Sequence, residues 1–263
     1  MDIRVTLCQL SVIWENIPSN LERIEVLLDN HGEEADLILL PELFSTGFTM
    51  NVTAMAETMD GRTVAWMKKM ARAKKAIIAG SIIIREQSRF YNRLITARPD
   101  GSTGFYDKRH LFRMSGENEH YSPGNKKMIV PLDRWRLCPM ICYDLRFPVW
   151  SRNRNDYDVL IYLANWPRQR MDVWDTLLKA RAIENHSYVI GINRVGTDGM
   201  DIGYQGRSML VDFRGQVMDV IEGPGEELRT HRLEWEALQE FRKKFPVHMD
   251  ADDFTIIRKQ NQS

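Results

Sequence analysis

Short apolar runs alternate with amphipathic stretches along the chain, and this alternation limits the possible folds more than any other feature of the sequence. Residues 3–9 form an apolar run typical of a buried strand, and residues 18–30 then repeat Leu21, Ile24 and Leu28 at helical spacing. Residues 76–84 read AIIAGSIII, apolar nearly throughout, as expected for a strand covered on both faces. The sequence therefore predicts an α/β protein.

The predicted strands are too numerous for one open sheet. Further strands are predicted at 36–40, 90–98, 103–107, 135–142, 157–164, 187–193, 206–212, 217–221 and 227–233, with helices at 60–75, 172–185 and 235–244. Because single open sheets rarely exceed about ten strands, we expect two sheets packed on each other with helices outside.

No composition break, low-complexity linker or internal repeat divides the chain. We therefore expect a single domain over residues 1–263, with a C-terminal tail from about residue 244 extending from it. Residues from Lys259 onward are polar and are expected to fray.

The charge balance argues against a nucleic-acid partner. Lys and Arg together number 36, as do Asp and Glu, so the formal net charge is zero, whereas nucleic-acid binding predicts a basic excess. The N-terminal residues do not resemble a secretory signal, and no apolar run approaches the roughly 20 residues of a membrane helix. We expect a soluble, cytoplasmic protein without a membrane partner.

Three cysteines, Cys8, Cys138 and Cys142, are too few and wrongly spaced for a disulfide framework or a zinc site. Free thiols in a reducing compartment are the expectation. Cys8 and Cys138 lie inside apolar runs and are interpreted as small core side chains. Cys142 differs because the apolar run ends at it and a polar segment follows.

Three apolar strands each lead directly into a residue able to do chemistry. The run 37–41 leads to Glu42, the run 103–107 leads to Lys108, and the run 137–141 leads to Cys142. In α/β proteins the ends of neighbouring strands open into one crevice, so we expect these three side chains to converge there. A carboxylate, an amine and a thiol together form a coherent catalytic set.

Each member of this set has a chemical task. A cysteine with an ordinary pKa of about 8.5 is only slightly ionised at neutral pH and needs a base or a nearby cation. Glu42 would take the thiol proton and later protonate the leaving amine. Lys108 and the backbone N–H of Tyr143 would hold the oxyanion. From residue types alone, a solvated strand end for Glu42 and a surface charge for Lys108 remain open.

Several blocks of the sequence resemble the nitrilase, or carbon–nitrogen hydrolase, superfamily. The three that contain the reactive residues are LLPELFSTGF at 39–48, FYDKRHLF at 105–112 and CYDLRFPVWSRN at 142–153. The resemblance continues in LANWP at 163–167, ARAIEN at 180–185 and NRVGTDG at 193–199. The segment YDKRHLFRM and the tail EFRKKFPVHMDADDF resemble the bacterial omega-amidases of that superfamily, which hydrolyse the terminal amide of 2-oxoglutaramate and 2-oxosuccinamate.

The resemblance implies a four-layer αββα sandwich that pairs with a second subunit into a homodimer or higher homo-oligomer. It implies Glu42 as base, Lys108 as cation and Cys142 as nucleophile, with no metal or organic cofactor. A further glutamate in the loop after the lysine is also implied. Glu117 and Glu119 are both candidates, and the spacing to residues 122–124 favours Glu117.

The far end of a small oxo-dicarboxylic monoamide requires a cation, and Arg is the preferred bidentate partner of a carboxylate. Arg146, Arg168 and Arg170 are candidates, with Arg113 behind them; for each, a surface ion pair is an equal alternative. Pocket walls are predicted from the aromatic side chains Phe48, Phe112, Tyr143 and Trp166.

Other functions are compatible with the same residues. Nitrilases, carbamoylases and other small-amide hydrolases share the proposed triad, and pocket shape separates them. A non-catalytic member would be expected to have lost a triad residue, and all three are present. A thiol redox protein would be expected to carry a resolving cysteine at short spacing, which this sequence lacks.

Overall fold

Two six-stranded sheets form the centre of the molecule in the computed structural model, which describes residues 1–257. The first sheet has the order β14-β1-β2-β3-β4-β5, in which the strands are β1 (Ile3–Gln9), β2 (Leu37–Leu39), β3 (Ile77–Glu86), β4 (Arg89–Ala97), β5 (Thr103–Asp107) and β14 (Glu227–Leu233). The second has the order β13-β12-β9-β8-β7-β6, formed by β6 (Val130–Leu132), β7 (Trp135–Ile141), β8 (Val159–Ala164), β9 (Tyr188–Asn193), β12 (Ser208–Val211) and β13 (Val217–Ile221).

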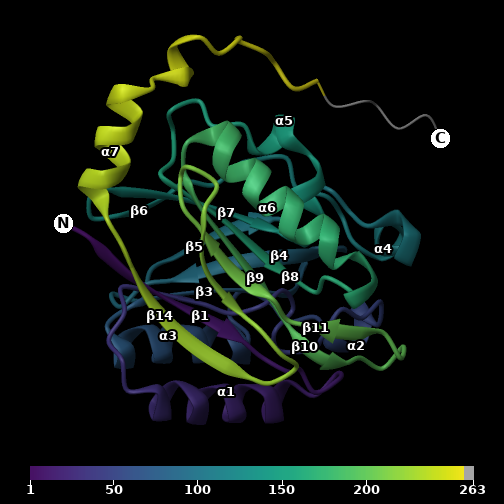
Figure 1. The fold of residues 1–263 in the computed structure, drawn as a ribbon. Coiled ribbons are helices and arrows are strands. Elements are labelled where there is room, and N and C mark those ends of the chain that lie inside the picture. The colour runs from purple at the N-terminus through teal and green to yellow at the C-terminus, as the bar shows by residue number, and fades with distance from the viewer. Residues whose placement is uncertain (258–263) are drawn as a thin grey trace.

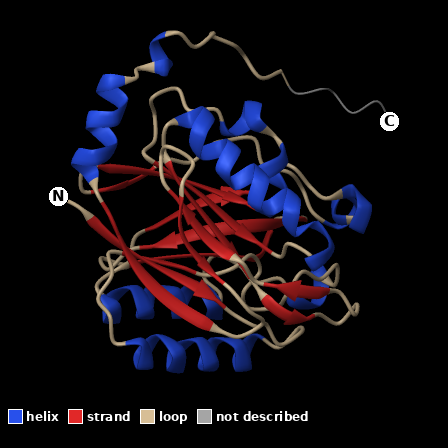
Figure 2. Ribbon diagram, viewed as in Figure 1, coloured by secondary structure: helices blue, strands red, loops and turns tan. Residues whose placement is uncertain are grey.

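Helices cover the outer faces of both sheets. The first sheet is covered by α1 (Ile17–His31) and α3 (Arg62–Lys74), and the second by α6 (Met171–Asn185) with the short α5 (Pro148–Ser151) (Figure 1). The secondary-structure view shows helices on opposite sides of the central strands (Figure 2). The prediction of an αββα sandwich is confirmed. The remaining helices are α2 (Val52–Met55), α4 (Glu117–His120) and α7 (Trp235–Lys244).

Local sequence explains where the helices begin and end. At α1, the Asn16 side chain accepts a hydrogen bond from the Ser19 backbone N–H at 3.1 Å, and Pro18 occupies the first turn, where its missing N–H costs nothing. Gly32 ends the helix in the left-handed conformation with φ 71°. Leu21, Ile24 and Leu28 of this helix are buried, as their spacing predicts.

The two sheets repeat one pattern of strand directions, although the sequence contains no visible repeat. From β14 to β5 the successive pairs are antiparallel, parallel, parallel, antiparallel and antiparallel. From β6 to β13 the pairs follow the same order. By this correspondence β2 matches β8, so the segments that leave these two strands occupy equivalent positions.

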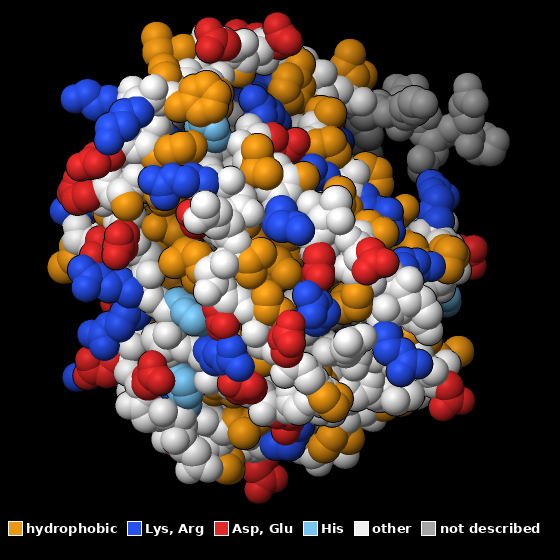
Figure 3. Space-filling view, in the orientation of Figure 1, with side chains coloured by type: hydrophobic (Ala, Val, Ile, Leu, Met, Phe, Trp, Pro, Cys, Tyr) orange, Lys and Arg blue, Asp and Glu red, His pale blue; other side chains and the backbone are white. Residues whose placement is uncertain are grey.

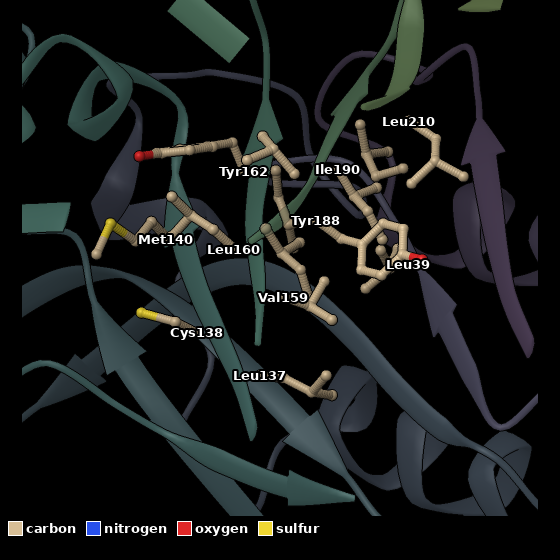
Figure 4. Close-up of a cluster of buried hydrophobic side chains, with 14 of the residues drawn as sticks. Leu39, Leu137, Cys138, Met140, Val159, Leu160, Tyr162, Tyr188, Ile190 and Leu210 are labelled. Atoms are coloured by element: carbon tan, nitrogen blue, oxygen red, sulfur yellow. The ribbon is translucent and has the colours of Figure 1, made fainter. Parts of the chain in front are cut away.

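Alternating side chains of each strand serve two different cores. In β1, Val5 and Leu7 face the second sheet, whereas Cys8 packs toward α1 and α3. Figure 4 shows apolar side chains on both faces of the second sheet, where Cys138 points to the same side as Met140 and Tyr162, the side that α6 covers. Cys8 and Cys138 are both fully buried free thiols, as the sequence predicts for core side chains.

The structure contains β6, α2 and α5, which were not predicted, and it differs from the predicted elements in further places. Cys142 lies outside β7 and begins a short 3-10 helix, Cys142–Arg146. The loop 109–124, predicted without regular structure, contains a 3-10 turn (Arg113–Ser115) and α4. A small hairpin of β10 (Val195–Thr197) and β11 (Gly203–Gln205) was not predicted, because its strands are three residues long and carry no period-two pattern.

The described surface adds little that would suggest a macromolecular ligand. On the face shown in Figure 3, basic and acidic side chains are interspersed. Among the helices of residues 1–257, none has both the length and the apolar character needed to cross a membrane. The tail after α7 includes the 3-10 turn Val247–Met249 and continues through residue 257; the predicted fraying from Lys259 lies outside the described residues.

Candidate active site

Cys142 occupies a strained position at the point where β7 ends. Its φ is 42°, a left-handed conformation that few non-glycine residues adopt. Such strain persists where the surrounding structure enforces it, and it concentrates at functional sites. The turn separates Cys142 from the inert cysteines of the strands, and its side chain is only 9% exposed. Its Sγ lies 3.8 Å from the Asn165 backbone oxygen.

Lys108 lies between two buried carboxylates. Its Nζ donates to Glu42 Oε1 at 2.9 Å and to both oxygens of Glu117, at 2.9 and 3.0 Å. All three side chains are at most 1% exposed. The ring of Phe48 lies 5.1 Å from the same Nζ. The three N–H donors of this ammonium are thereby directed at carboxylates.

Both oxygens of Glu42 are held by donors. Oε1 accepts from Lys108 and from Asn92 Nδ2 at 2.8 Å. Oε2 accepts from the backbone N–H of Asn165 at 2.8 Å and from its Nδ2 at 3.3 Å. A buried charge is tolerated only when it is paired and hydrogen-bonded, and these four donors meet that requirement.

The protonation states follow from burial and from neighbouring charge. Burial and the Glu42 carboxylate raise the pKa of the Cys142 thiol well above its ordinary value, against the opposing effect of Lys108. Burial would lower the pKa of Lys108, but Glu117 and Glu42 outweigh it and raise that pKa well above the usual value. Burial also raises the pKa of Glu117. These directions favour a neutral thiol beside a charged ammonium in the resting site.

Asp144, two residues after Cys142, ties the turn to the loop that follows β5. Its Oδ1 accepts from the His110 backbone N–H at 3.0 Å and lies 2.7 Å from His110 Nδ1. Its Oδ2 accepts from the Tyr106 hydroxyl at 2.7 Å and from the Ile141 N–H at 3.2 Å. This fully buried carboxylate fixes the position of Cys142 relative to Lys108.

A pocket of about 500 Å³ opens onto Glu42, Lys108 and Cys142. This volume is typical of small-molecule sites. Its walls are mainly aromatic and apolar side chains, namely Trp14, Phe48, Met50, Phe112, Tyr143, Trp166, Met200, Ile202 and Tyr204. The four aromatic residues predicted as pocket walls, Phe48, Phe112, Tyr143 and Trp166, are all among them.

The structure places most of the predicted site residues together. Tyr143, Arg146 and Trp166 line the pocket. Glu117 is the glutamate that contacts Lys108, from behind the pocket wall, whereas Glu119 is exposed. Tyr143 follows Cys142 at the start of the 3-10 helix, where backbone N–H groups have no partner within the helix.

The prediction that Arg168 contributes to this pocket does not agree with its position. Arg168 is exposed on a 3-10 turn and does not line the pocket, whereas Arg170, at the end of the same turn, does. The two-residue offset on a helical turn directs these side chains apart. Arg113 also lies outside the pocket lining.

The expected convergence of neighbouring strands was only partly right. Glu42 and Lys108 follow β2 and β5, which are separated by two strands in the first sheet, and Cys142 follows β7 in the second sheet. Because β3, β4 and β5 alternate in direction, β5 runs the same way as β2. The three residues thus leave the same end of the sandwich.

Sequence reasoning missed Asn92 and Asn165, which hold Glu42. Asn165 falls within LANWP, one of the blocks that resemble the superfamily. The sequence therefore marked its position but did not indicate that it binds Glu42. Asn92 lies inside β4 and had no such signal. Within residues 1–257, no group of three or more His, Cys, Asp or Glu side chains is arranged to hold a metal ion.

The pocket holds a buried thiol beside a carboxylate and an ammonium. These are the catalytic groups expected of a cysteine-dependent hydrolase. The chain belongs to the carbon–nitrogen hydrolase family, whose model matches residues 4–243. The sequence-based assignment to the nitrilase superfamily is thereby confirmed.

Two of the similar relatives are amidases. The chain is 43% identical to the omega-amidase YafV of Escherichia coli K12, over 97% of this chain and 98% of that protein. It is 33% identical to a 2-oxoglutaramate amidase of Bacillus subtilis, over 94% and 96% of the two chains.

Solved structures agree with this assignment. A carbon–nitrogen hydrolase superfamily protein of Xanthomonas campestris, with an arsenic adduct in its active site, is 41% identical and superimposes with a TM-score of 0.95, covering 97% of this chain and 99% of that one. Nit3 of Saccharomyces cerevisiae, of the nitrilase superfamily, is 26% identical with a TM-score of 0.86, covering 94% and 95%.

Proposed function

We propose that this protein is an omega-amidase, which hydrolyses the terminal amide of small oxo-dicarboxylic monoamides such as 2-oxoglutaramate and 2-oxosuccinamate to the acid and ammonia. The observation that carries the proposal is Lys108 held between Glu42 and Glu117 beside Cys142, in a chain 43% identical to an omega-amidase. One domain spanning residues 1–263 would supply every group.

The proposed acylation begins with the neutral thiol. Glu42 takes the proton of Cys142 as Sγ attacks the amide carbon, which forms the C–S bond. Once Glu42 has taken the proton, the N–H of Lys108 that was bonded to this carboxylate turns to the oxyanion and stabilises it together with the Tyr143 N–H. Glu42 then gives the proton to the nitrogen, the C–N bond breaks, and ammonia leaves a thioester on Cys142. The raised pKa of the thiol supports a requirement for this base.

Deacylation uses the same groups in reverse. Glu42 takes a proton from water as the water oxygen attacks the thioester carbon. The C–S bond then breaks, the acid is released, and Glu42 returns the proton to Sγ to restore the thiol. Glu117 would keep Lys108 charged and in place throughout, because it contacts the same ammonium through both oxygens. No step in this proposal requires a cofactor.

The substrate's distal carboxylate would be recognised by Arg146 and Arg170. Both line the pocket, and their guanidinium groups lie over the rings of Trp166, at 5.3 Å, and Phe112, at 5.1 Å. Neither forms a salt bridge with a carboxylate among residues 1–257. Two cations without carboxylate partners in the pocket wall suit an anionic substrate end, since the lining carboxylates Glu15 and Asp198 accept hydrogen bonds from Asn51 and Tyr204 instead.

The proposed activity is tested by ammonia release from a panel of oxo-acid amides, amino-acid amides, carbamoyl compounds and aliphatic nitriles. We expect 2-oxoglutaramate to be hydrolysed far faster than nitriles, with the Cys142→Ala variant as the blank. Faster hydrolysis of nitriles or carbamoyl compounds would assign the protein to another branch of the family. Ammonia release that persists in Cys142→Ala would reject the proposed nucleophile.

We also propose that the protein acts in the cytoplasm as a homodimer or higher homo-oligomer, as the superfamily resemblance implies. Large apolar side chains exposed on the outer helices support association, since Val149 of α5 is 56% exposed and Ile183 of α6 is 54% exposed. Size-exclusion chromatography with light scattering tests the assembly.

A further inference from the structure

Two aromatic rings of the pocket wall lie beneath the two arginines that line it. The Arg146 Cζ lies 5.3 Å from the centre of the Trp166 ring, and the Arg170 Cζ lies 5.1 Å from the centre of the Phe112 ring. Trp166 is 3% exposed and belongs to the main apolar core. Phe112 is half-buried and belongs to none of the apolar clusters found among residues 1–257. Core packing therefore explains the position of Trp166 but not that of Phe112.

The backbone of Phe112 is held close to the catalytic groups. Its N–H donates to Glu117 Oε2 at 2.5 Å, and its carbonyl oxygen accepts from the Ser115 N–H at 3.1 Å and from the Ser115 hydroxyl at 2.8 Å. Glu117 is the carboxylate that contacts Lys108 through both oxygens. The Phe112 ring therefore starts from a backbone position that is fixed relative to Lys108.

The same ring also contacts the residue next to the nucleophile. The ring centres of Phe112 and Tyr143 are 5.0 Å apart with 62° between the ring planes, an edge-to-face arrangement that aromatic pairs prefer. Tyr143 follows Cys142, and its N–H is the proposed oxyanion donor. Phe112 thus lines the pocket between the group that would hold the amide and Arg170, which would hold the distal carboxylate.

This placement bears on the length of the substrate. A monoamide held at both ends has a fixed distance between its amide carbon and its distal carboxylate, so a longer chain fits only when its middle bows sideways. On the Phe112 side of the pocket the ring occupies the space that such a bow requires. In closely fitted pockets one methylene changes kcat/KM by about 10- to 200-fold.

We propose that Phe112 determines the substrate chain length, because its ring excludes monoamides that are one methylene longer than 2-oxoglutaramate. The proposal rests on the amidase function above. The ring touches no reacting atom in the proposed mechanism, so its role is in selection. Replacing the ring by a methyl group opens a space between Tyr143 and Arg170, into which the longer chain bows while its amide stays at Cys142.

The experiment compares two substrates that differ by one methylene, 2-oxoglutaramate and the six-carbon homologue 2-oxoadipamate. The measured quantity is the ratio of kcat/KM for the longer amide to kcat/KM for the shorter one, so a general loss of activity in a variant cancels. The variants are Phe112→Ala and Phe112→Tyr, which keeps the ring. Ile202→Ala is the matched control, because Ile202 lines the pocket from the loop between β10 and β11, which carries neither Tyr143 nor an arginine.

We expect the wild type to hydrolyse the longer amide with a kcat/KM at least about tenfold lower than that of the shorter one. Phe112→Ala should raise the long-to-short ratio at least about fivefold, because the space left by a truncated side chain is only partly refilled. Phe112→Tyr and Ile202→Ala should keep the ratio of the wild type within about twofold. Phe112→Leu provides a second variant without the ring, and thermal unfolding checks that each protein is folded.

Three results would overturn the inference: equal hydrolysis of both amides by the wild type, a smaller rise of the ratio in the variants without the ring, or an equal rise in Phe112→Tyr or Ile202→Ala. Failure of the proposed function is distinguishable, since the wild type would then hydrolyse neither amide. Hydrolysis of 2-oxoglutaramate by the wild type, with the same ratio in Phe112→Ala, rejects the inference alone.

Discussion

The inner end of the pocket and its mouth are built on opposite principles. At the inner end, Glu42 and Lys108 are at most 1% exposed, and their charged atoms are hydrogen-bonded on all sides. At the mouth, Met200 is 70% exposed, and the Arg170 guanidinium is held by the face of Phe112 and a methionine sulfur. The side chains of the inner end can therefore adopt one arrangement, whereas those of the mouth can adopt several.

This difference separates chemistry from selection. In a buried ion cluster each charge depends on the others, so the removal of one partner leaves an uncompensated charge. A half-exposed cation is already solvated and contributes chiefly when a ligand pairs with it. Changes at the inner end should therefore lower kcat, and changes at the mouth should raise KM.

The largest expected effect in this comparison is that of Glu117→Gln. The substitution keeps the shape of the side chain but removes one of the two carboxylates that hold Lys108. We expect kcat for 2-oxoglutaramate to fall at least about a hundredfold with little change in KM, because misplacing one electrostatic group at the reacting centre costs on that order. Steady-state kinetics measures both constants.

Glu119→Gln is the matched control for this variant. Glu119 lies in the same short helix, is exposed, and contacts neither Lys108 nor the pocket. We expect its kinetics to stay within about twofold of the wild type, as is usual for surface changes. Comparable losses in both variants would mean that the whole helix, rather than the Glu117 carboxylate, supports Lys108.

The next effect concerns the mouth. Arg146→Met and Arg170→Met each remove a guanidinium group from the pocket wall. We expect each to raise KM for 2-oxoglutaramate about tenfold, with kcat changed less than about threefold, since a charge-assisted hydrogen bond contributes about 1.5 kcal/mol or more. An amide without a distal carboxylate should show no such increase.

Arg168→Met serves as the control for the mouth, because Arg168 is exposed and lies outside the pocket lining. Its KM should match that of the wild type. An increase in KM for Arg168→Met, with none for the other two variants, would single out Arg168 among the three arginines that the sequence offers as candidates. A fall in kcat for Arg146→Met or Arg170→Met would show that the mouth also shapes the reacting centre.

The same division describes what the sequence could predict. The bounds of β1, β5, β13 and β14 were predicted residue for residue, because period and composition are local properties. The reactive residues at strand ends and the superfamily blocks located Glu42, Lys108 and Cys142. The choice of Glu117 over Glu119 came from the spacing that the superfamily resemblance implies, and the contact with Lys108 agrees with it.

The rest depends on contacts between residues distant in sequence. Asn92 is 50 residues from Glu42, and Asn165 is 123 residues from it, so no local pattern links them. The positive φ of Cys142 is likewise enforced by the surrounding structure, including the bond from the Ile141 N–H to Asp144. Arg168 was misplaced because the direction of a side chain on a short turn is not a property of composition.

The smallest expected effect tests whether the inner end holds a neutral thiol or a preformed thiolate. Of the three cysteines only Cys142 lines the pocket, whereas burial raises the pKa of Cys138 to about 12 and that of Cys8 further. Labelling of the native protein with iodoacetamide, followed by peptide mass spectrometry, should therefore modify Cys142 alone between pH 7 and 10.

The pH dependence of that labelling shows whether the pKa of Cys142 is raised or lowered. Because burial and Glu42 raise the pKa of Cys142, the thiolate is scarcer than in free cysteine at every pH below that pKa, and the labelling rate should still be rising above pH 8.5. Glu42→Gln removes the carboxylate charge but leaves the burial of Cys142. The labelling profile of this variant should therefore move to lower pH, and its labelling rate at pH 8 should be a few-fold higher than that of the wild type. A wild-type rate that levels off below pH 8.5 would mean that Lys108 stabilises a resting thiolate. In that case attack would need no base, and the role of Glu42 would begin only when the amide nitrogen takes its proton.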